Sequence, residues 1–474
     1  MTTPAINLTL CSPRPSAKSS SGPVVVSSPV PSQSQLEKGQ IVVRVDRFGW
    51  SANNVTYQAL GEHPHFRYYD FHSVPSNSGH VSPATHGLVP VWGFGTVVTS
   101  AHPKVFTGER LYGYFAPARY VVLPIDEKDV NKYSMYIPRP HLPADRRVYN
   151  QIQRCSTDPL YTPETEDLSM LYKPLFWTSY WCEDWLARSG YRGGCEYILI
   201  SSASSKTAFC FAYCVRNRLE AQAGGSAGGS NDLNALRIIG LTSKANLEFT
   251  KNLGLYDQVY EYDSFLCAPS SSPFHTRDTS GANTNTPRWI YIDVAGNFAL
   301  NSKIYTHFAS PYVFPTLIAS ISLGMTNLAP GEKGAQSIDW STSTGSSAST
   351  NPSSSSSLSF KNSDSRSDSQ QHQHSLGFWP RAEHFFTPEW LAVRRTQLSP
   401  TEMFEMQKRA WDGLMRDCTA WVDLEYVRGG EKVRKVYEDV LGGRRGISPD
   451  KGWIWSMWDE GDVEDNVGTP RAKL

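Results

Sequence analysis

The chain has 474 residues, of which 45 are Lys or Arg and 45 are Asp or Glu, so its formal net charge is zero. Balanced charge excludes a broad electrostatic field that would recruit nucleic acid or an acidic membrane surface. The length exceeds that of one ordinary domain and predicts two or three.

Eight cysteines lie scattered along the chain without a CxxC pair, which predicts a reducing, cytoplasmic location and no structural zinc. No apolar run approaches the roughly 20 residues that a membrane-spanning helix needs. Residues 1–40 are rich in Ser, Pro and Val and contain no acidic residue before Glu37. This composition predicts a disordered tail, with a weak organelle-targeting segment as the alternative.

Short β-rich runs follow between residues 41 and 136, among them "IVVRV", "WGFGTVVTS" and "RLYGYF". Gly and Pro punctuate them, which is typical of a small barrel or sandwich. We assign residues 41–173 to this β-rich domain. The pattern then changes: apolar runs at 197–201, 237–241, 258–262, 289–294 and 316–323 predict strands, and helices are expected at 206–218 and 244–253. This alternation predicts an α/β domain over residues 174–330, with a doubly wound parallel sheet.

A Ser-rich tract over residues 331–376 has too little apolar surface to form a core, so we expect a disordered insertion there. Residues 220–232 and 268–287 have a similar composition. His372 and His374 lie in the Ser-rich tract, where a solvated loop is favoured over an adventitious metal site. Residues 377–474 are expected to return to the N-terminal domain, because the apolar run "GWIWSMW" needs a sheet to join.

Four motifs carry a family resemblance: "NNVTYQALG", "WTSYWCEDWL", "LISSASSKTA" and "YIDVAGN". Together with the domain order, they resemble the medium-chain dehydrogenase/reductase superfamily, in particular its zinc-independent quinone-oxidoreductase branch. More narrowly, they are similar to a little-characterised family of unassigned function. The resemblance implies a GroES-like N-terminal domain and a Rossmann-like nucleotide-binding domain. Asn54, Thr56 and Trp92 stand where zinc-dependent relatives have metal ligands, so the resemblance implies no catalytic zinc.

The turn "SSASSKTA" has no glycine, whereas relatives have a small-x-x-Gly-x-x-Gly pattern there. The matching positions are Ser202, Ser205 and Ala208. In the functional interpretation, the amides of the helix N-terminus and the side chains of Ser202, Ser205, Lys206 and Thr207 hold a pyrophosphate. In the alternative, a serine caps the helix, Lys206 is solvated and the ligand has been lost.

The second strand of the nucleotide fold leads into Thr242, Ser243 and Lys244, without the carboxylate that holds the ribose 2′-hydroxyl of NAD. Two hydroxyls and a lysine suit a 2′-phosphate, so the cofactor expected is NADP(H). An ordinary helix start is the alternative explanation of this run.

The resemblance also implies where the chemistry occurs. Asn297 and Gly324 follow strand ends that would line the nicotinamide site. Tyr57 is the candidate proton donor and Asn54 a polar orienting group, although Tyr57 equally fits a core aromatic. The chain is therefore expected to be an NADPH-dependent, zinc-independent reductase of an activated carbonyl, quinone, enone or enoyl substrate.

Two other function classes are considered. A non-catalytic descendant of the fold, acting as a binding or interaction module, remains open. A serine hydrolase is disfavoured because the turn lacks a Gly-x-Ser-x-Gly elbow. The expected partner is a small-molecule substrate, with no nucleic acid and no membrane, and a homodimer is left open.

Overall fold

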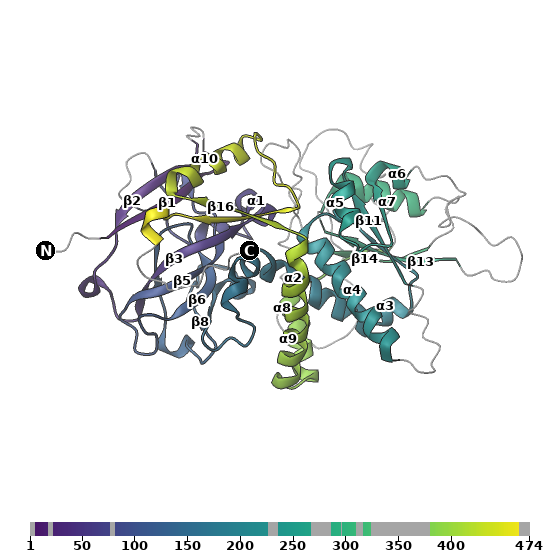
Figure 1. Cartoon of the computed structure of the whole chain (residues 1–474), viewed down its shortest axis with the longest axis horizontal. Helices are drawn as coiled ribbons and strands as arrows, with labels where there is room; N and C mark the ends of the chain where they lie inside the picture. The colour runs from purple at the N-terminus through teal and green to yellow at the C-terminus, as the bar shows by residue number, and fades with distance from the viewer. Residues whose placement is uncertain are drawn as a thin grey trace, which may run out of the picture.

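The computed structural model describes residues 5–17, 22–75, 81–225, 236–266, 286–294, 296–309, 316–323 and 380–463. Two domains lie side by side: one is built on a large, mainly antiparallel sheet, and the other on a parallel sheet (Figure 1). The predicted fold class, a β-rich domain joined to a Rossmann-like doubly wound sheet, is confirmed. The helices are α1 (Ala52–Ala59), α2 (Glu166–Arg188), α3 (Gly190–Gly193), α4 (Lys206–Gly225), α5 (Leu247–Asn252), α6 (Tyr262–Leu266), α7 (Phe298–Ala309), α8 (Thr387–Gln397), α9 (Pro400–Asp417) and α10 (Gly430–Leu441).

The β-rich domain is organised around an eight-stranded sheet in the order β16-β17-β3-β5-β6-β9-β8, with β7 also pairing with β3. Apolar side chains of its central strands, including Val43, Val97 and Leu111, form one buried core. The strands of this sheet are β3 (Gln40–Trp50), β5 (Val91–Ser100), β6 (Arg110–Phe115), β7 (Tyr120–Pro124), β8 (Ser134–Tyr136), β9 (Gln151–Arg154), β16 (Asp423–Arg428) and β17 (Lys451–Ser456).

The N-terminal residues form a hairpin, so the predicted disordered tail over residues 1–40 is wrong for the part that the structure describes. Strand β1 (Ile6–Pro13) pairs antiparallel with β2 (Val24–Pro29) and also with β4 (His86–Gly87). Leu10 and Cys11 are buried in the β-rich core. The Ser/Pro-rich composition concealed this hairpin because a few apolar residues are enough once a strand docks on a preformed core.

The parallel sheet has six strands in the order β12-β11-β10-β13-β14-β15. Numbered along the chain, this is the 3-2-1-4-5-6 order of a dinucleotide-binding fold. One face packs on α2 and α4, and the other on α6 and α7. The strands are β10 (Tyr197–Ile200), β11 (Arg237–Thr242), β12 (Gln258–Glu261), β13 (Arg288–Asp293), β14 (Thr316–Ser322) and β15 (Ala382–His384).

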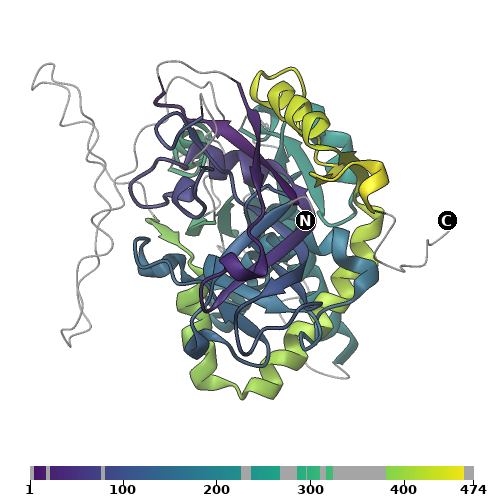
Figure 2. The same ribbon diagram turned by 90° about the vertical axis from the view of Figure 1, so that its left-hand side faces the viewer.

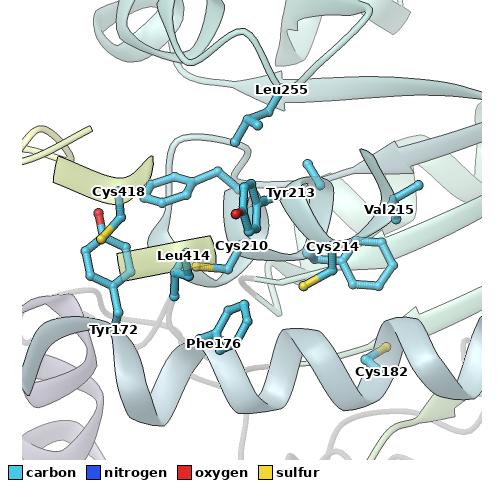
Figure 3. Packing of buried hydrophobic residues seen from close by; sticks show 14 of the residues in the cluster. Tyr172, Phe176, Cys182, Cys210, Tyr213, Cys214, Val215, Leu255, Leu414 and Cys418 are labelled. Atoms are coloured by element: carbon cyan, nitrogen blue, oxygen red, sulfur yellow. The ribbon is translucent and has the colours of Figure 1, made fainter. Parts of the chain in front are cut away.

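Helix α2 covers one face of the parallel sheet together with α4. Figure 3 shows Tyr172 and Phe176 of α2 lying close to Cys210 and Leu414, which come from α4 and α9. All four side chains are fully or almost fully buried. Because α2 begins at Glu166 and belongs to this core, the parallel-sheet domain begins before the predicted boundary at residue 174.

The C-terminal segment is shared between the two domains, so the prediction that all of 377–474 returns to the N-terminal domain is wrong in part. Strand β15 extends the parallel sheet, and α8 and α9 contact α2. Only β16, α10 and β17 belong to the β-rich domain, where β17 pairs antiparallel with β3. In the view turned by 90°, helices α8, α9 and α10 lie on the outside of the molecule (Figure 2).

The predicted Ser-rich insertion at 331–376 lies outside the described residues, as do most of the two shorter insertions. In the part of the chain that the structure describes, no helix combines the length and the apolar character needed to cross a lipid bilayer.

Candidate functional site

The order of strands in the parallel sheet reverses at β10. The strand that follows β10 in the chain, β11, pairs with one edge of β10, whereas β13 pairs with its other edge. In open α/β sheets, ligands bind outside the carboxyl ends of the strands at such a point. The candidate site is therefore formed by the turn after β10, residues 201–205, and by the segments after β11 and β13.

The turn after β10 presents hydroxyl groups to the carboxyl edge of the sheet. Ser202 has a left-handed backbone conformation, with φ of +51°. The Ser205 hydroxyl accepts a hydrogen bond from the Ala208 amide at 3.3 Å and therefore caps α4. Ser202, Ser205 and Thr207 are half-buried, whereas Ala203 and Ala208 are fully buried. The structure thus brings three of the predicted cradle residues to one rim, at the N-terminus of a long helix.

Lys206 takes a different direction from the one predicted. Its side chain is only 8% exposed. Its Nζ donates hydrogen bonds to the carbonyl oxygens of Pro449 and Lys451, at 3.0 and 3.2 Å. The amine is therefore hydrogen-bonded to residues 449–451, the part of the C-terminal segment that leads back into the β-rich domain and is called the C-terminal return below. These contacts fit neither a pyrophosphate ligand nor a solvated lysine.

A buried polar network joins the turn to the end of β13. Asp293 is 5% exposed and accepts hydrogen bonds from the Ser201 hydroxyl (3.2 Å), the Gly296 amide (2.9 Å) and the Asn301 side-chain amide (2.7 Å). The Ser201 hydroxyl in turn accepts from the Val294 amide at 3.0 Å. This network fixes the turn after β10, the end of β13 and the start of α7 relative to one another.

The loop after β11 contains the predicted 2′-phosphate site. Thr242 is fully buried, and its hydroxyl has no hydrogen-bond partner among the described residues. Ser243 is half-buried and Lys244 is exposed. The Asn246 side-chain amide donates to the Ser204 hydroxyl at 3.1 Å, which joins this loop to the turn after β10. Ser243 and Lys244 are therefore placed at the edge where a ligand would lie, whereas Thr242 is beneath it.

Two tyrosines that the sequence analysis missed also contact the turn. The hydroxyl of Tyr262, which follows β12, lies 3.3 Å from the Ser202 hydroxyl. The Tyr256 hydroxyl donates to the Ala203 carbonyl at 2.8 Å. Tyr262 is the last residue of the third predicted strand, in "YEYDS", and this position was a signal that could have identified it, because that strand ends at the same edge of the sheet.

Asn297 and Gly324 were predicted to line the nicotinamide site. The Asn297 side-chain oxygen accepts a hydrogen bond from the Leu300 amide at 3.0 Å, so it caps the start of α7. Helix α7 itself was not predicted. Gly324 lies outside the described residues.

Tyr57 and Asn54 lie on α1 in the β-rich domain. The Tyr57 hydroxyl accepts hydrogen bonds from the Asn53 side-chain amide (2.7 Å) and the Trp92 indole (3.2 Å), and it also interacts with the Tyr114 hydroxyl. Burial raises the pKa of Tyr57 well above its ordinary value, so the phenol stays protonated at neutral pH. The Tyr57 ring also packs against Tyr68, with centroids 4.6 Å apart, as a core aromatic would.

Asn54 has a structural set of contacts. Its side-chain oxygen accepts from the Ser51 amide at 2.9 Å, and its side-chain nitrogen donates to the Pro90 carbonyl at 3.3 Å. The polar neighbour that orients Tyr57 is Asn53, which the sequence analysis missed. Trp92 packs against the cores of both domains, which places the Tyr57 side of the β-rich domain near the boundary between them.

The three positions that were predicted to take the place of zinc ligands are Asn54, Thr56 and Trp92. Asn54 and Thr56 are buried, and Trp92 is half-buried. Among the residues that the structure describes, no three His, Cys, Asp or Glu side chains gather as metal ligands would.

Solved structures similar to this chain include CurA from Vibrio vulnificus in complex with NADPH, with 10% identity and a TM-score of 0.46, covering 96% of this chain and 100% of that one. The yhdH oxidoreductase from Salmonella enterica in complex with NADP has 11% identity and a TM-score of 0.41, covering 95% and 99%. An alcohol dehydrogenase from Thermotoga maritima has 10% identity and a TM-score of 0.46, covering 95% and 99%.

A comparison with curated proteins found no match. A protein-family model matches residues 48–445, a range that includes most of the β-rich domain, the turn after β10 and most of the C-terminal segment. The predicted membership in a family of unassigned function is confirmed: the chain belongs to the family DUF2855, proteins of unknown function.

Proposed function

We propose that this protein is an NADP(H)-dependent, zinc-independent reductase of an activated carbonyl, quinone, enone or enoyl substrate. The observation that carries the proposal is the 3-2-1-4-5-6 parallel sheet with a hydroxyl-rich turn at its switch point. That turn leads directly into α4, a helix that begins at Lys206 and ends at Gly225. This is the arrangement in which dinucleotides bind.

The pyrophosphate would be held at the N-terminus of α4. First-turn amides of a helix have no acceptor within the helix, and the helix dipole favours an anion there. The half-buried hydroxyls of Ser202, Ser205 and Thr207 supply further donors at the same rim. The left-handed Ser202 supports this assignment, because non-glycine residues in that conformation gather at functional sites.

The preference for NADP over NAD is supported by the loop after β11. Lys244 is exposed and has no ion-pair partner among the described residues, so its ammonium is free to meet a 2′-phosphate. Ser243 adds a half-buried hydroxyl beside it. No carboxylate in residues 242–246 would repel the phosphate.

NADPH, when bound, supplies the hydride. The protein then has to deliver a proton to the substrate oxygen or, for an enone or enoyl substrate, to the carbon α to the carbonyl group. Tyr57 is the proposed donor, because its hydroxyl accepts two hydrogen bonds and retains its proton. Asn53 and Trp92 hold the phenol in place and stabilise the phenolate that forms after transfer.

Two contacts favour a second candidate function, a non-catalytic binding module. Lys206 is bonded to the C-terminal return, and the Tyr262 hydroxyl lies against Ser202 at the mouth of the turn. Both contacts would be retained if the fold had lost its nucleotide. Measured nucleotide binding separates the two candidates.

The test combines binding with turnover. Thr207→Ala removes a hydroxyl that has no hydrogen-bond partner among the described residues, so the fold should be unaffected. We expect NADPH affinity to fall about tenfold, because a hydrogen bond to a charged group contributes about 1.5–3 kcal/mol. Thr107→Ala, at an exposed position in the loop between β5 and β6 whose hydroxyl likewise has no hydrogen-bond partner among the described residues, is the matched control. NADPH oxidation with 1,4-naphthoquinone then tests the reaction. Absence of binding of both NADPH and NADH by wild type would contradict the proposal and favour the binding-module alternative.

A further inference from the structure

Lys206 is the first residue of α4 in the parallel-sheet domain, yet its side chain reaches the segment that leads into the β-rich domain. It bonds to the carbonyl oxygens of Pro449 and Lys451, 243 and 245 residues away in sequence. These residues lead into β17, which pairs antiparallel with β3 at the centre of the β-rich sheet. One side chain therefore connects the start of the phosphate turn's helix to a strand of the β-rich domain.

The position is costly for an ammonium group. It is 8% exposed and lies at the positive end of a helix dipole. Burial lowers the pKa of Lys206 to about 8. The ionisable groups that face it are the thiols of Cys210 on α4 and Cys418 after α9, together with the Asp450 carboxylate on the return.

The two facing thiols do not change charge near that pH. Burial raises the pKa of both thiols, that of Cys418 to about 12 and that of Cys210 well above its ordinary value, so both stay protonated at pH 7–9.5. Tyr172, which faces the same thiols from α2, also has a pKa well above its ordinary value. Lys206 is thus the group in this cluster whose charge changes between pH 7 and 9.5.

We propose that Lys206 is a positioning residue that couples phosphate binding at the α4 N-terminus to the strength of the hydrogen bonds between this helix and the C-terminal return. The inference rests on the proposed function, because it requires a phosphate at the turn. An anion there favours the charged form of the nearby amine, and an ammonium donates stronger hydrogen bonds to the two carbonyls than a neutral amine does. By linkage, the ammonium favours the anion to the same extent.

The coupling predicts a pH-dependent nucleotide affinity. Unit charges roughly 10 Å apart, at an effective dielectric constant of about 20, change an equilibrium by roughly tenfold. We therefore expect the NADPH dissociation constant of wild type to rise about five- to tenfold between pH 7.0 and 9.5. Starting at pH 7.0 keeps the 2′-phosphate mostly ionised, because its pKa is about 6.

Three variants isolate the role of Lys206. Lys206→Arg keeps a permanent charge and should bind NADPH with a nearly constant affinity over this range. Lys206→Met keeps the length of the side chain but has no donor, so it should bind more weakly, also without pH dependence. Lys251→Met removes an exposed lysine on α5 and should retain the wild-type profile.

Hydrogen exchange gives a readout that a merely structural lysine would not change. NADPH should slow amide exchange in residues 451–456 of wild type and Lys206→Arg, but not of Lys206→Met. A flat wild-type profile, or a Lys206→Arg variant that keeps the wild-type pH dependence, would overturn the coupling while leaving the reductase proposal intact. Failure of wild type to bind NADPH at any pH would instead overturn the proposed function, and the coupling with it.

Discussion

Replacing Asp293 with asparagine should weaken the fold at the switch point of the sheet. The carboxylate accepts from three donors, and at 5% exposure it has little access to water. Asparagine keeps one acceptor oxygen and introduces an NH₂ group that faces donors. We estimate a loss of about 2–4 kcal/mol in the free energy of unfolding, since a hydrogen bond to a charged group contributes about 1.5–3 kcal/mol and a mispaired buried donor costs about 1–3, partly offset by no longer burying a charge.

The assay is urea unfolding of Asp293→Asn, followed by circular dichroism. Asp263→Asn is the matched control, because this aspartate is exposed and pairs only with the exposed Lys303 among the described residues, so it should cost at most about 0.5 kcal/mol. NADPH binding should also fall in Asp293→Asn, since the network holds the turn after β10. An Asp293→Asn protein as stable as the control would refute the assignment of this network as the anchor of the site.

Three further predictions concern charge, pH and catalysis. Lys244→Ala should weaken NADPH binding by about 1–3 kcal/mol and leave NADH binding almost unchanged, whereas Lys251→Ala should affect neither; equal losses for both nucleotides would contradict the 2′-phosphate assignment. Lys206 has a folded-state pKa near 8, below the unfolded value of 10.5. Between these values the unfolded chain binds more protons, so the free energy of unfolding of wild type relative to Lys206→Met should rise with pH, by about 1.5 kcal/mol from pH 8 to 9.5 in urea titrations; a falling difference would be inconsistent. Tyr57→Phe should lower kcat for NADPH-dependent reduction of 1,4-naphthoquinone by about 10²-fold or more with unchanged NADPH affinity, and full activity would remove Tyr57 from the mechanism.

Most strands of the parallel sheet could be predicted because they are continuous apolar runs such as "YILI" in β10, which are typical of strands buried on both faces. Strand β15 was not predicted, because "AEH" is short, polar and exposed, and only its pairing with β14 defines it as a strand. The N-terminal hairpin was missed for a related reason. Its strands gain their stability from docking on the β-rich core, which local composition does not show.

The candidate site likewise has a part that local sequence predicts and a part that depends on contacts between residues far apart in the chain. The turn and its hydroxyls follow from local sequence, since a strand, a run of small residues and a helix are adjacent in the chain. The partners of Lys206 lie about 240 residues away, and no local pattern indicates where a long flexible side chain will point. Tyr262 likewise meets Ser202 only because parallel strands bring their carboxyl ends to one edge.

The central claim is that the glycine-free turn still binds a dinucleotide and prefers the one with a 2′-phosphate. The most direct test is a pair of equilibrium titrations of the purified wild-type protein at pH 7.0, one with NADPH and one with NADH, followed by nicotinamide fluorescence. The account predicts saturable binding of both, with NADPH at least about tenfold tighter. Tighter binding of NADH, or no binding of either nucleotide, would contradict it.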